Sequence, residues 1–356
     1  MQTGTEASRR LRLDAPIVQG PFGSGLSSVD LAVAVSESGG LGSFGVHHLE
    51  GAGIRDIAAR IRARTQRTFA LNLWIPHQDA DDPKLTDSQW NGALELLRPW
   101  FEELRMPLPE RPARFMPRYD EQVETVLELR PPVFSFVFGV PSAEVLERCR
   151  RTGIVTIGAA TIPEEAKLLA DAGVDMIVAS GMEAGGHRVS FLREPEDCLT
   201  GTLALVPAMV DTVRVPVIAA GGIVDGRGIA AALKLGASAA QIGTAFLACE
   251  ESNATSLHRQ MLFSDAARRT SLTRAFTGRL ARSIHNEFIE KLRGKETQLP
   301  PYPVQAWLTG RLKEAALKAG RSDVISLWAG QGVGRLKHRT AGELFKSLVA
   351  TAFDAH

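Results

Sequence analysis

The sharpest candidate for chemistry in this sequence is His187, which ends the segment Glu183-Ala-Gly-Gly-His187 one residue after an apolar run at 176–181. Paired glycines let the backbone pass close to a flat ligand, and the imidazole would then face that ligand. Histidine has an unperturbed pKa of about 6.5, which suits it to accept a proton near neutral pH. We therefore interpret His187 as a candidate catalytic base, and Glu183 as a residue that fixes the loop. The alternative is a histidine that only caps this loop.

Glycines also mark two later apolar runs. Gly221 and Gly222 end one run, and Gly243 and Thr244 lie within the next. Backbone N–H groups at such positions can hold a phosphate, and the Thr244 hydroxyl could add a donor. The glycines could instead merely turn the chain. Their presence at two successive runs favours a phosphate site.

A few polar residues stand inside or just after apolar runs. Asn72 and Gln241 lie inside them, where an amide needs a partner and could bind either a heterocycle edge or a backbone carbonyl. His47 and His48 follow another run, but no third ligand stands at metal spacing, so we interpret them as loop residues and expect no metal. The segment GQGVG at 330–334 loosely resembles a phosphate loop, but no clear apolar strand precedes it, so we interpret it as a surface loop.

The elements that would position these residues are short buried strands. Most of the apolar runs do not alternate with polar residues, as is typical of strands covered on both faces. Amphipathic stretches separate the runs, and eight such units in about 235 residues predict an α/β fold, a (β/α)8 TIM barrel. A doubly wound open sheet is the alternative. The eight runs are 15–20, 41–45, 69–74, 133–139, 154–160, 176–181, 216–222 and 239–246.

Two segments do not fit the repeating pattern. A long insert follows the third strand, and a helix-rich segment follows the eighth. Long connections in compact domains usually have a function. We therefore expect the barrel at 12–75 and 119–255, and an additional helical domain at 76–118 and 256–350 that covers the substrate.

Composition limits the class of protein. Of 356 residues, 41 are lysine or arginine and 40 are aspartate or glutamate, so the formal charge of +1 argues against nucleic-acid binding. The three widely spaced cysteines indicate a reduced compartment. We find no signal peptide, no membrane span, and no dinucleotide, P-loop, zinc-protease or serine-hydrolase motif, so we expect a cytoplasmic protein.

Several spaced motifs together resemble the nitronate monooxygenase (2-nitropropane dioxygenase) family. The resemblance runs in order across about 15–345, and the later motifs look like the class I branch. The motifs are PIVQGP at 16–21, LNL at 71–73, EAGGHR at 183–188, PVIAAGGI at 216–223, DGRGI at 225–229, QIGTAF at 241–246, YPVQ at 302–305 and LWAGQ at 327–331.

The resemblance implies a barrel that binds FMN, with His187 as the base for neutral nitroalkanes and as an orienting group for nitronates. Electrons would pass from the nitronate to FMN and on to O2, which yields a carbonyl compound and nitrite. Phe22 and Tyr302 would contact the substrate. The residues expected at FMN are Gln19, Gly20, Pro21, Asn72, Ser180, Gly181, Gly185, Gly186, Gly221, Gly222, Gln241, Ile242, Gly243 and Thr244.

Three positions depart from the family pattern. Ser180 stands where glutamine is common, Phe22 where methionine is usual, and Val189 where glycine is common. These departures bear on the identity of the substrate more than on the identity of the cofactor. An FMN-dependent NAD(P)H reductase, of the enoyl-acyl-carrier-protein or quinone type, is an alternative, as is a flavin-holding protein without turnover. The expected partners are a small nitronate or nitroalkane and O2, with no nucleic acid or membrane; a homo-oligomer is left open.

Overall fold

The computed structural model describes residues 4–76, 83 and 85–354. In this part of the chain eight parallel strands form one sheet in the order β1-β9-β8-β6-β5-β4-β3-β2. A parallel bridge between Val18 and Leu41 joins the two ends, so the sheet closes into the predicted (β/α)8 barrel. The strands are β1 (Ile17–Gln19), β2 (Gly42–Gly45), β3 (Phe69–Trp74), β4 (Val133–Val137), β5 (Val155–Ala160), β6 (Met176–Ser180), β8 (Val217–Ala220) and β9 (Ala239–Ile242).

The predicted strands agree closely with the observed ones, except at the last. The run at 239–246 was expected to be one strand, but β9 ends at Ile242 and a short helix, α10 (Thr244–Leu247), follows. Gly243 separates the two elements with φ of −98° and ψ of −83°. An apolar run cannot by itself distinguish a buried strand from a buried helical turn, which explains the difference.

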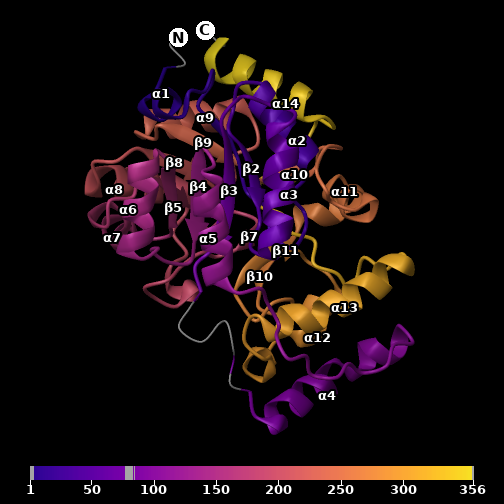
Figure 1. The fold of residues 1–356 in the computed structure, drawn as a ribbon. Coiled ribbons are helices and arrows are strands. Elements are labelled where there is room, and N and C mark those ends of the chain that lie inside the picture. Colours follow the sequence, from indigo (N-terminus) through magenta and orange to yellow (C-terminus); the bar gives the residue numbers. More distant parts are fainter. Residues whose placement is uncertain (1–3, 77–82, 84, 355–356) are drawn as a thin grey trace.

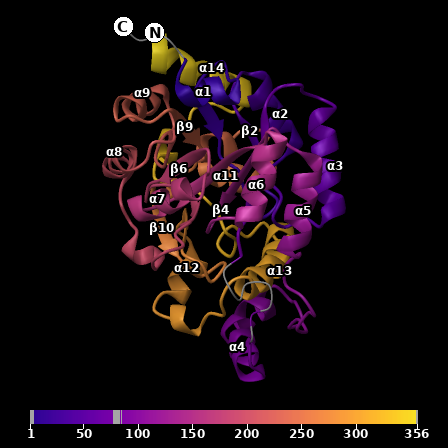
Figure 2. The ribbon, with the colours of Figure 1, turned by 60° about the vertical axis from the view of Figure 1, so that its left-hand side comes forward.

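Helices surround the barrel on its outside, as Figures 1 and 2 show. Serine caps two of them, because Ser28 accepts from the Leu31 N–H and Ser142 from the Val145 N–H. The helices between consecutive barrel strands are α2 (Val29–Glu37), α3 (Gly51–Arg62), α5 (Tyr119–Leu129), α6 (Ala143–Thr152), α7 (Pro163–Asp171), α8 (Thr202–Thr212) and α9 (Gly226–Lys234).

The C-terminal helices complete this outer ring. The α-helix α14 (Ala341–Val349) continues into a π-helix, η5 (Ala350–Asp354), and together they pack on α2 and α9. Leu344 and Phe345 are buried in the same apolar cluster as the barrel helices. We therefore propose that residues 341–353 belong to the barrel, and that the covering domain consists of residues 85–118 and 256–336.

The opposite ends of the barrel are covered differently. Helix α1 (Glu6–Leu11) lies at the amino ends of the strands, where Ala7 and Leu11 join an apolar cluster with Val18 and Ile218 of the barrel. The other end carries the covering layer, which Figure 1 shows below the barrel. No helix in the described ranges is both long enough and apolar enough to span a membrane.

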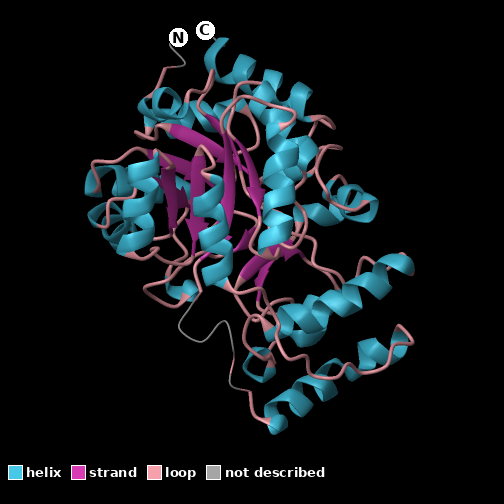
Figure 3. Cartoon of the chain, in the orientation of Figure 1, coloured by secondary structure: helices cyan, strands magenta, loops and turns pink. Residues whose placement is uncertain are grey.

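The covering layer combines helices with a small antiparallel sheet, seen in Figure 3 below the barrel strands. Strand β11 pairs with β10 on one side and with the two-residue β7 on the other. This sheet was not predicted. The elements are α4 (Asp87–Glu103), β7 (Gly186–His187), η1 (Pro195–Asp197), α11 (Ser256–Leu262), η2 (Asp265–Arg268), β10 (Thr270–Thr273), β11 (Ala281–Ile284), α12 (Glu287–Leu292), η3 (Glu296–Gln298), α13 (Val304–Lys318) and η4 (Val333–Arg335).

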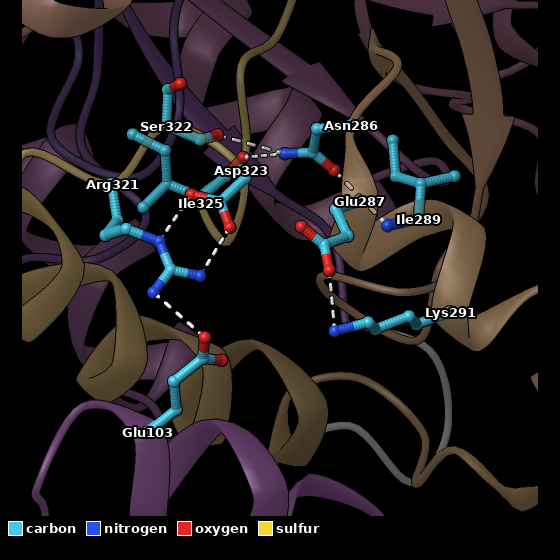
Figure 4. A network of polar contacts seen from close by, with 9 residues as sticks. All are labelled: Glu103, Asn286, Glu287, Ile289, Lys291, Arg321, Ser322, Asp323 and Ile325. Carbon is cyan, nitrogen blue, oxygen red and sulfur yellow. Dashed lines mark hydrogen bonds and ion pairs between the residues drawn. The ribbon is translucent and has the colours of Figure 1, made fainter.

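Polar contacts tie the two parts of this layer together (Figure 4). Arg321 donates to Glu103 of α4 at 3.1 Å and pairs with Asp323. Asn286, which caps α12, donates to the carbonyl oxygens of Ser322 at 3.2 Å and Ile325 at 2.9 Å. The insert after β3 and the segment after β9 therefore form one structural unit, although more than 200 residues separate Glu103 from Arg321.

Candidate active site

A cavity lies over the carboxyl ends of the barrel strands, where sites form in this fold. It contains about 1210 Å³ of empty space, part of it open to solvent. A cleft at the carboxyl ends of the strands that is lined mainly by apolar residues with a few polar groups is the usual form of a small-molecule or cofactor site. Its wall also includes Trp328 and Gly330 from the covering layer.

The structure brings most of the predicted site residues to this one cavity. Ser180, Phe22 and Val189, the three departures from the family pattern, all lie in the wall. The predicted residues that line the cavity are Gly20, Pro21, Phe22, Asn72, Ser180, Gly185, Gly186, His187, Gly221, Gly222, Gln241, Gly243 and Thr244.

Four predicted residues do not line the cavity. Gln19 is fully buried behind it, and its side chain accepts from the Ser43 N–H at 2.8 Å and donates to the Gly20 carbonyl. Gly181 and Ile242 likewise lie behind the wall, and Tyr302 lines a neighbouring cavity. Gln19 therefore acts on the shape of the wall through the backbone of the adjacent loop.

The two glycine loops present free backbone donors at one place. The N–H groups of Gly222, Gly243 and Thr244 donate to no other group among the described residues. Gly222 has a φ of +68°, which favours glycine, and a Cβ on Gly243 would meet no atom within 4 Å. Free backbone N–H groups in glycine loops can bind anions, so the presence of these three groups in the wall of one cavity fits a phosphate.

The loop that contains Gly330 closes over these donors. The Gly330 N–H donates to the Thr244 hydroxyl oxygen at 2.8 Å, and the Gln331 N–H donates to the Glu183 carbonyl at 2.9 Å. A Cβ on Gly330 would lie 2.8 Å from that carbonyl oxygen. The interpretation of 330–334 as a surface loop was therefore wrong, because Gly330 is buried and lines the cavity.

Amide side chains line another part of the wall. Asn72 is 3% exposed and donates from Nδ2 to the Ser135 hydroxyl at 3.0 Å, while its carbonyl oxygen has no partner among the described residues. The Gln241 side chain has no hydrogen bond there either. Both amides are therefore available to the edge of a bound heterocycle.

Strand β7 positions His187. The strand pairs with β11 so that His187 lies opposite Ala281. The imidazole Nε2 is 2.9 Å from the Thr277 hydroxyl oxygen, and the ring lies edge-on to Trp74 with 4.9 Å between ring centroids. Trp328 is at 5.4 Å on another side. One hydrogen bond and two aromatic rings therefore fix the orientation of the imidazole.

The Thr277 hydroxyl indicates which imidazole nitrogen is free. It can donate to the Arg279 carbonyl at 3.2 Å, and then it accepts the proton of His187 Nε2. Nδ1 then carries the lone pair, and it has no protein partner among the described residues. We assign this tautomer from the hydrogen-bond network. It makes Nδ1 the nitrogen that can accept a proton.

Burial keeps His187 neutral. Burial first, and the nearby charge of Arg279 second, lower the pKa of His187 from 6.5 to about 3. Desolvation disfavours the charged form of an imidazole. At neutral pH the residue is therefore an uncharged acceptor of low basicity.

Sequence reasoning missed several residues around His187. Trp74 could have been identified, because it lies two residues after Asn72 in a strand, and residues at that spacing share a face. Thr277 and Arg279 carried no signal, since they come from a turn about 90 residues after His187. Trp328 lies in one of the quoted family motifs but was given no role.

Two charged residues near the site have structural roles. Glu183 accepts from the Thr202 N–H at 3.0 Å and from its hydroxyl at 2.8 Å, which agrees with the expected role of fixing its loop. Arg188 is 2% exposed and donates to the carbonyls of Gly181 at 2.6 Å and Ser180 at 2.7 Å. Its guanidinium therefore holds the backbone under the cavity and does not line the wall.

Known proteins resemble this chain over nearly its whole length. A family model described as nitronate monooxygenase matches residues 7–351. A probable nitronate monooxygenase of Staphylococcus aureus (strain Newman) is 37% identical over 325 residues, which cover 91% of this chain and 90% of that protein. The structure of nitroalkane oxidase from Streptomyces ansochromogenes is 38% identical, with a TM-score of 0.89 and coverage of 98% and 97%. FabK from Thermotoga maritima is 26% identical, with a TM-score of 0.76 and coverage of 99% and 97%.

Proposed function

Because this chain belongs to the nitronate monooxygenase family of oxidoreductases, we propose that it oxidises alkyl nitronates with O2 and binds FMN in the main cavity. The observation that carries this proposal is that one cavity is lined both by free backbone N–H groups that can bind a phosphate and by the neutral His187. The products would be a carbonyl compound and nitrite.

The residues of the wall fit FMN. The N–H groups of Gly222, Gly243 and Thr244 would hold its phosphate, and the amides of Asn72 and Gln241 would meet the polar edge of its ring system. When bound, FMN supplies a ring system that accepts electrons from the substrate and gives them to O2.

Nδ1 of His187 would accept the proton of the substrate. With a neutral nitroalkane, Nδ1 takes the proton from the carbon beside the nitro group, and Nε2 keeps its hydrogen bond to Thr277. The resulting imidazolium donates from Nδ1 to the nitronate. A preformed nitronate brings a negative charge but no proton. This charge would raise the pKa of His187, and the same complex forms when the imidazole takes a proton from solvent. Because the free imidazole is weakly basic, we expect preformed nitronates to be the better substrates.

The experiment that tests this function has three arms. We expect the purified protein to be yellow, with a flavin spectrum, and to release FMN on denaturation. With 1-butyl nitronate, O2 uptake should be accompanied by nitrite. Under anaerobic conditions the nitronate should bleach the flavin. Bleaching by NAD(P)H and not by the nitronate would establish the reductase alternative, and a colourless protein that cannot be reconstituted with FMN would refute the proposal.

A further inference from the structure

The indole ring of Trp74 lines both the main cavity and a smaller cavity beside it. It lies edge-on to the imidazole of His187, with 4.9 Å between the ring centroids and 74° between the ring planes. The indole N–H of Trp74 has no hydrogen-bond partner among the described residues. The position of this ring therefore depends on the side chains that pack against it.

His47 provides the closest aromatic contact of Trp74 in the described part of the chain. Its imidazole stacks flat on the indole, with 3.9 Å between centroids and 7° between planes. Phe138 and Tyr302 meet the indole at larger angles, 65° and 39°, with centroids 5.1 Å and 5.5 Å away. An aromatic pair contributes free energy beyond the area that it buries. The stack on His47 is therefore the contact that restrains the face of the indole.

The pairing of β2 with β3 brings the two rings to the same level. The strands run parallel with Gly45 opposite Asn72. Two residues further along each strand path come His47 and Trp74, so the two side chains are neighbours in the same register. The Gln122 side chain donates to the His47 carbonyl at 2.8 Å and thereby holds the loop that follows β2.

His47 contributes its ring face and neither a charge nor a hydrogen bond. The residue is 4% exposed, and burial first, with the charge of His48 second, lowers the pKa of His47 well below its ordinary value. Its Nδ1 is buried without a partner within residues 4–76, 83 and 85–354. A buried polar atom without a partner costs free energy. His47 lines the smaller cavity and not the main one, so it does not touch the reacting atoms.

The backbone at Gly23 packs against the edge of both rings. A Cβ at this position would lie 2.9 Å from Cε1 of His47 and 3.1 Å from Cζ2 of Trp74. Both rings are therefore confined on the side of this loop, which also lines the main cavity. The stack and the loop together leave the indole little room to move away from His187.

From these contacts we propose that His47 is a positioning residue: its ring holds Trp74 against His187, and so keeps the imidazole in the orientation in which Nε2 bonds to Thr277 and Nδ1 faces the substrate. His47 acts through Trp74 and not by contact with a ligand. The effect on turnover rests on the proposed function, whereas the orientation of the rings does not.

Two substitutions of His47 separate the ring face from the filling of space. His47→Leu fills a similar volume without a flat ring, and His47→Phe keeps an aromatic face. We expect nitrogen-15 NMR to show a mixture of the two neutral tautomers of His187 in His47→Leu, and the Nε2–H form in His47→Phe and in the wild type. This signal needs no turnover. An unchanged His187 signal in the leucine variant would overturn the proposal, whatever the protein oxidises.

Kinetics should show that the stack serves the removal of the proton. With neutral 1-nitrobutane we expect His47→Leu to lower kcat/KM by about two- to tenfold, and His47→Phe to recover most of it. With the preformed nitronate His47→Leu should change kcat/KM by less than about twofold, because no proton leaves the substrate. Equal losses with both substrates would contradict a role in orienting the base. If the wild type oxidises neither substrate, the proposed function fails and the NMR result alone decides the positioning.

A double-mutant cycle tests whether His47 acts through Trp74. Trp74→Leu removes the indole, so the addition of His47→Leu should cause no further change in the tautomer ratio of His187 or in kcat/KM. Losses that add up would show that His47 influences His187 by another route and would refute the proposal.

His48 offers a matched control. Its ring lies edge-on to that of His47, with 5.4 Å between centroids, and it lines neither cavity. His48→Leu should leave both the His187 signal and kcat/KM for 1-nitrobutane unchanged. An effect as large as that of His47→Leu would mean that the loop as a whole, and not the stack on Trp74, positions the base.

Discussion

The Nε2 atom of His187 lies 2.9 Å from the Thr277 hydroxyl oxygen, which is itself 3.2 Å from the Arg279 carbonyl oxygen. The chain of donors runs from the imidazole through the hydroxyl to the backbone. It leaves Nδ1 as the nitrogen that can accept a proton. His187 comes from β7, and Thr277 and Arg279 come from the turn between β10 and β11. The small sheet of the covering layer therefore determines which imidazole nitrogen of His187 can accept a proton.

Removal of the Thr277 hydroxyl should therefore weaken the preference of the His187 imidazole for one neutral tautomer. We expect Thr277→Val to lower kcat/KM for 1-nitrobutane by about tenfold, because Nε2 loses its acceptor and the two neutral tautomers become closer in free energy. Thr277→Ser keeps the hydroxyl and should recover most of the activity. Nitrogen-15 NMR of the imidazole should show Nε2–H in the wild type and a mixture in Thr277→Val. An unchanged tautomer in the valine variant would contradict the assignment.

The base and orienting roles of His187 predict different losses for two substrates. We expect His187→Asn to lower turnover of neutral nitroalkanes by about 10²–10⁴-fold, because His187 is the one titratable residue among the described residues of the cavity wall. Activity on the preformed nitronate should fall much less, by about tenfold, since asparagine can still donate a hydrogen bond. Steady-state O2 uptake with both forms of 1-nitrobutane measures the ratio. Equal losses would show that His187 is not the base.

The barrel could be predicted because its evidence is local. Continuous apolar runs such as the one containing Val217 and Ile218 indicate strands covered on both faces, and most of these runs contain a glycine. The place of α14 could not be predicted, since an amphipathic pattern shows that one face is buried but not against which partner. Strand β7 has two residues, which is too short for any alternation.

The residues of the candidate site could likewise be predicted only in part. Glycine pairs and the polar residues in strands pointed to the wall, because the carboxyl ends of parallel strands meet at one end of the barrel. Thr277 and Arg279 are brought to the site by the pairing of β11 with β7, and nothing near them in the sequence indicates that pairing. The barrel side of the cavity was thus accessible to sequence reasoning, and most of the covering side was not.

Gly243 offers a direct test of the phosphate site. A side chain there would meet no protein atom within 4 Å of its Cβ and would instead project into the cavity. We expect Gly243→Leu to weaken FMN binding by roughly 10- to 100-fold, as measured by quenching of flavin fluorescence, because it fills the space beside the N–H groups. The FMN-free protein should melt within a few degrees of the wild type.

A matched glycine substitution provides the control for that experiment. Gly92 in α4 also has no atom within 4 Å of its Cβ position, but it lies on the surface of the covering layer. Gly92→Ala should leave FMN affinity unchanged and should add about 0.5–1 kcal/mol to the stability. If Gly243→Leu binds FMN as tightly as Gly92→Ala does, the phosphate does not lie at this loop.

The buried His258 predicts how stability depends on pH. Its Nε2 is 3.2 Å from the Trp328 carbonyl oxygen, and burial first, with the Lys313 charge second, lowers its pKa to about 4. Because the pKa is lower in the folded state, the unfolded chain binds the extra proton between pH 6.5 and about 4. Stability is therefore lost as the pH falls through this window, by about 1.4 kcal/mol for each pH unit from this residue alone.

Substitution of His258 should remove the part of the pH dependence of the unfolding free energy that this residue causes. His258→Gln keeps a donor for the Trp328 carbonyl but cannot be protonated, so between pH 7 and pH 5 it should lose about 2 kcal/mol less of unfolding free energy than the wild type. Urea unfolding of the FMN-free protein at the two pH values measures the difference. Between pH 7 and pH 8.5 wild type and variant should change equally, because the histidine is neutral in both the folded and the unfolded state there. An identical loss in both proteins at pH 5 would mean that His258 is not buried as an uncharged group.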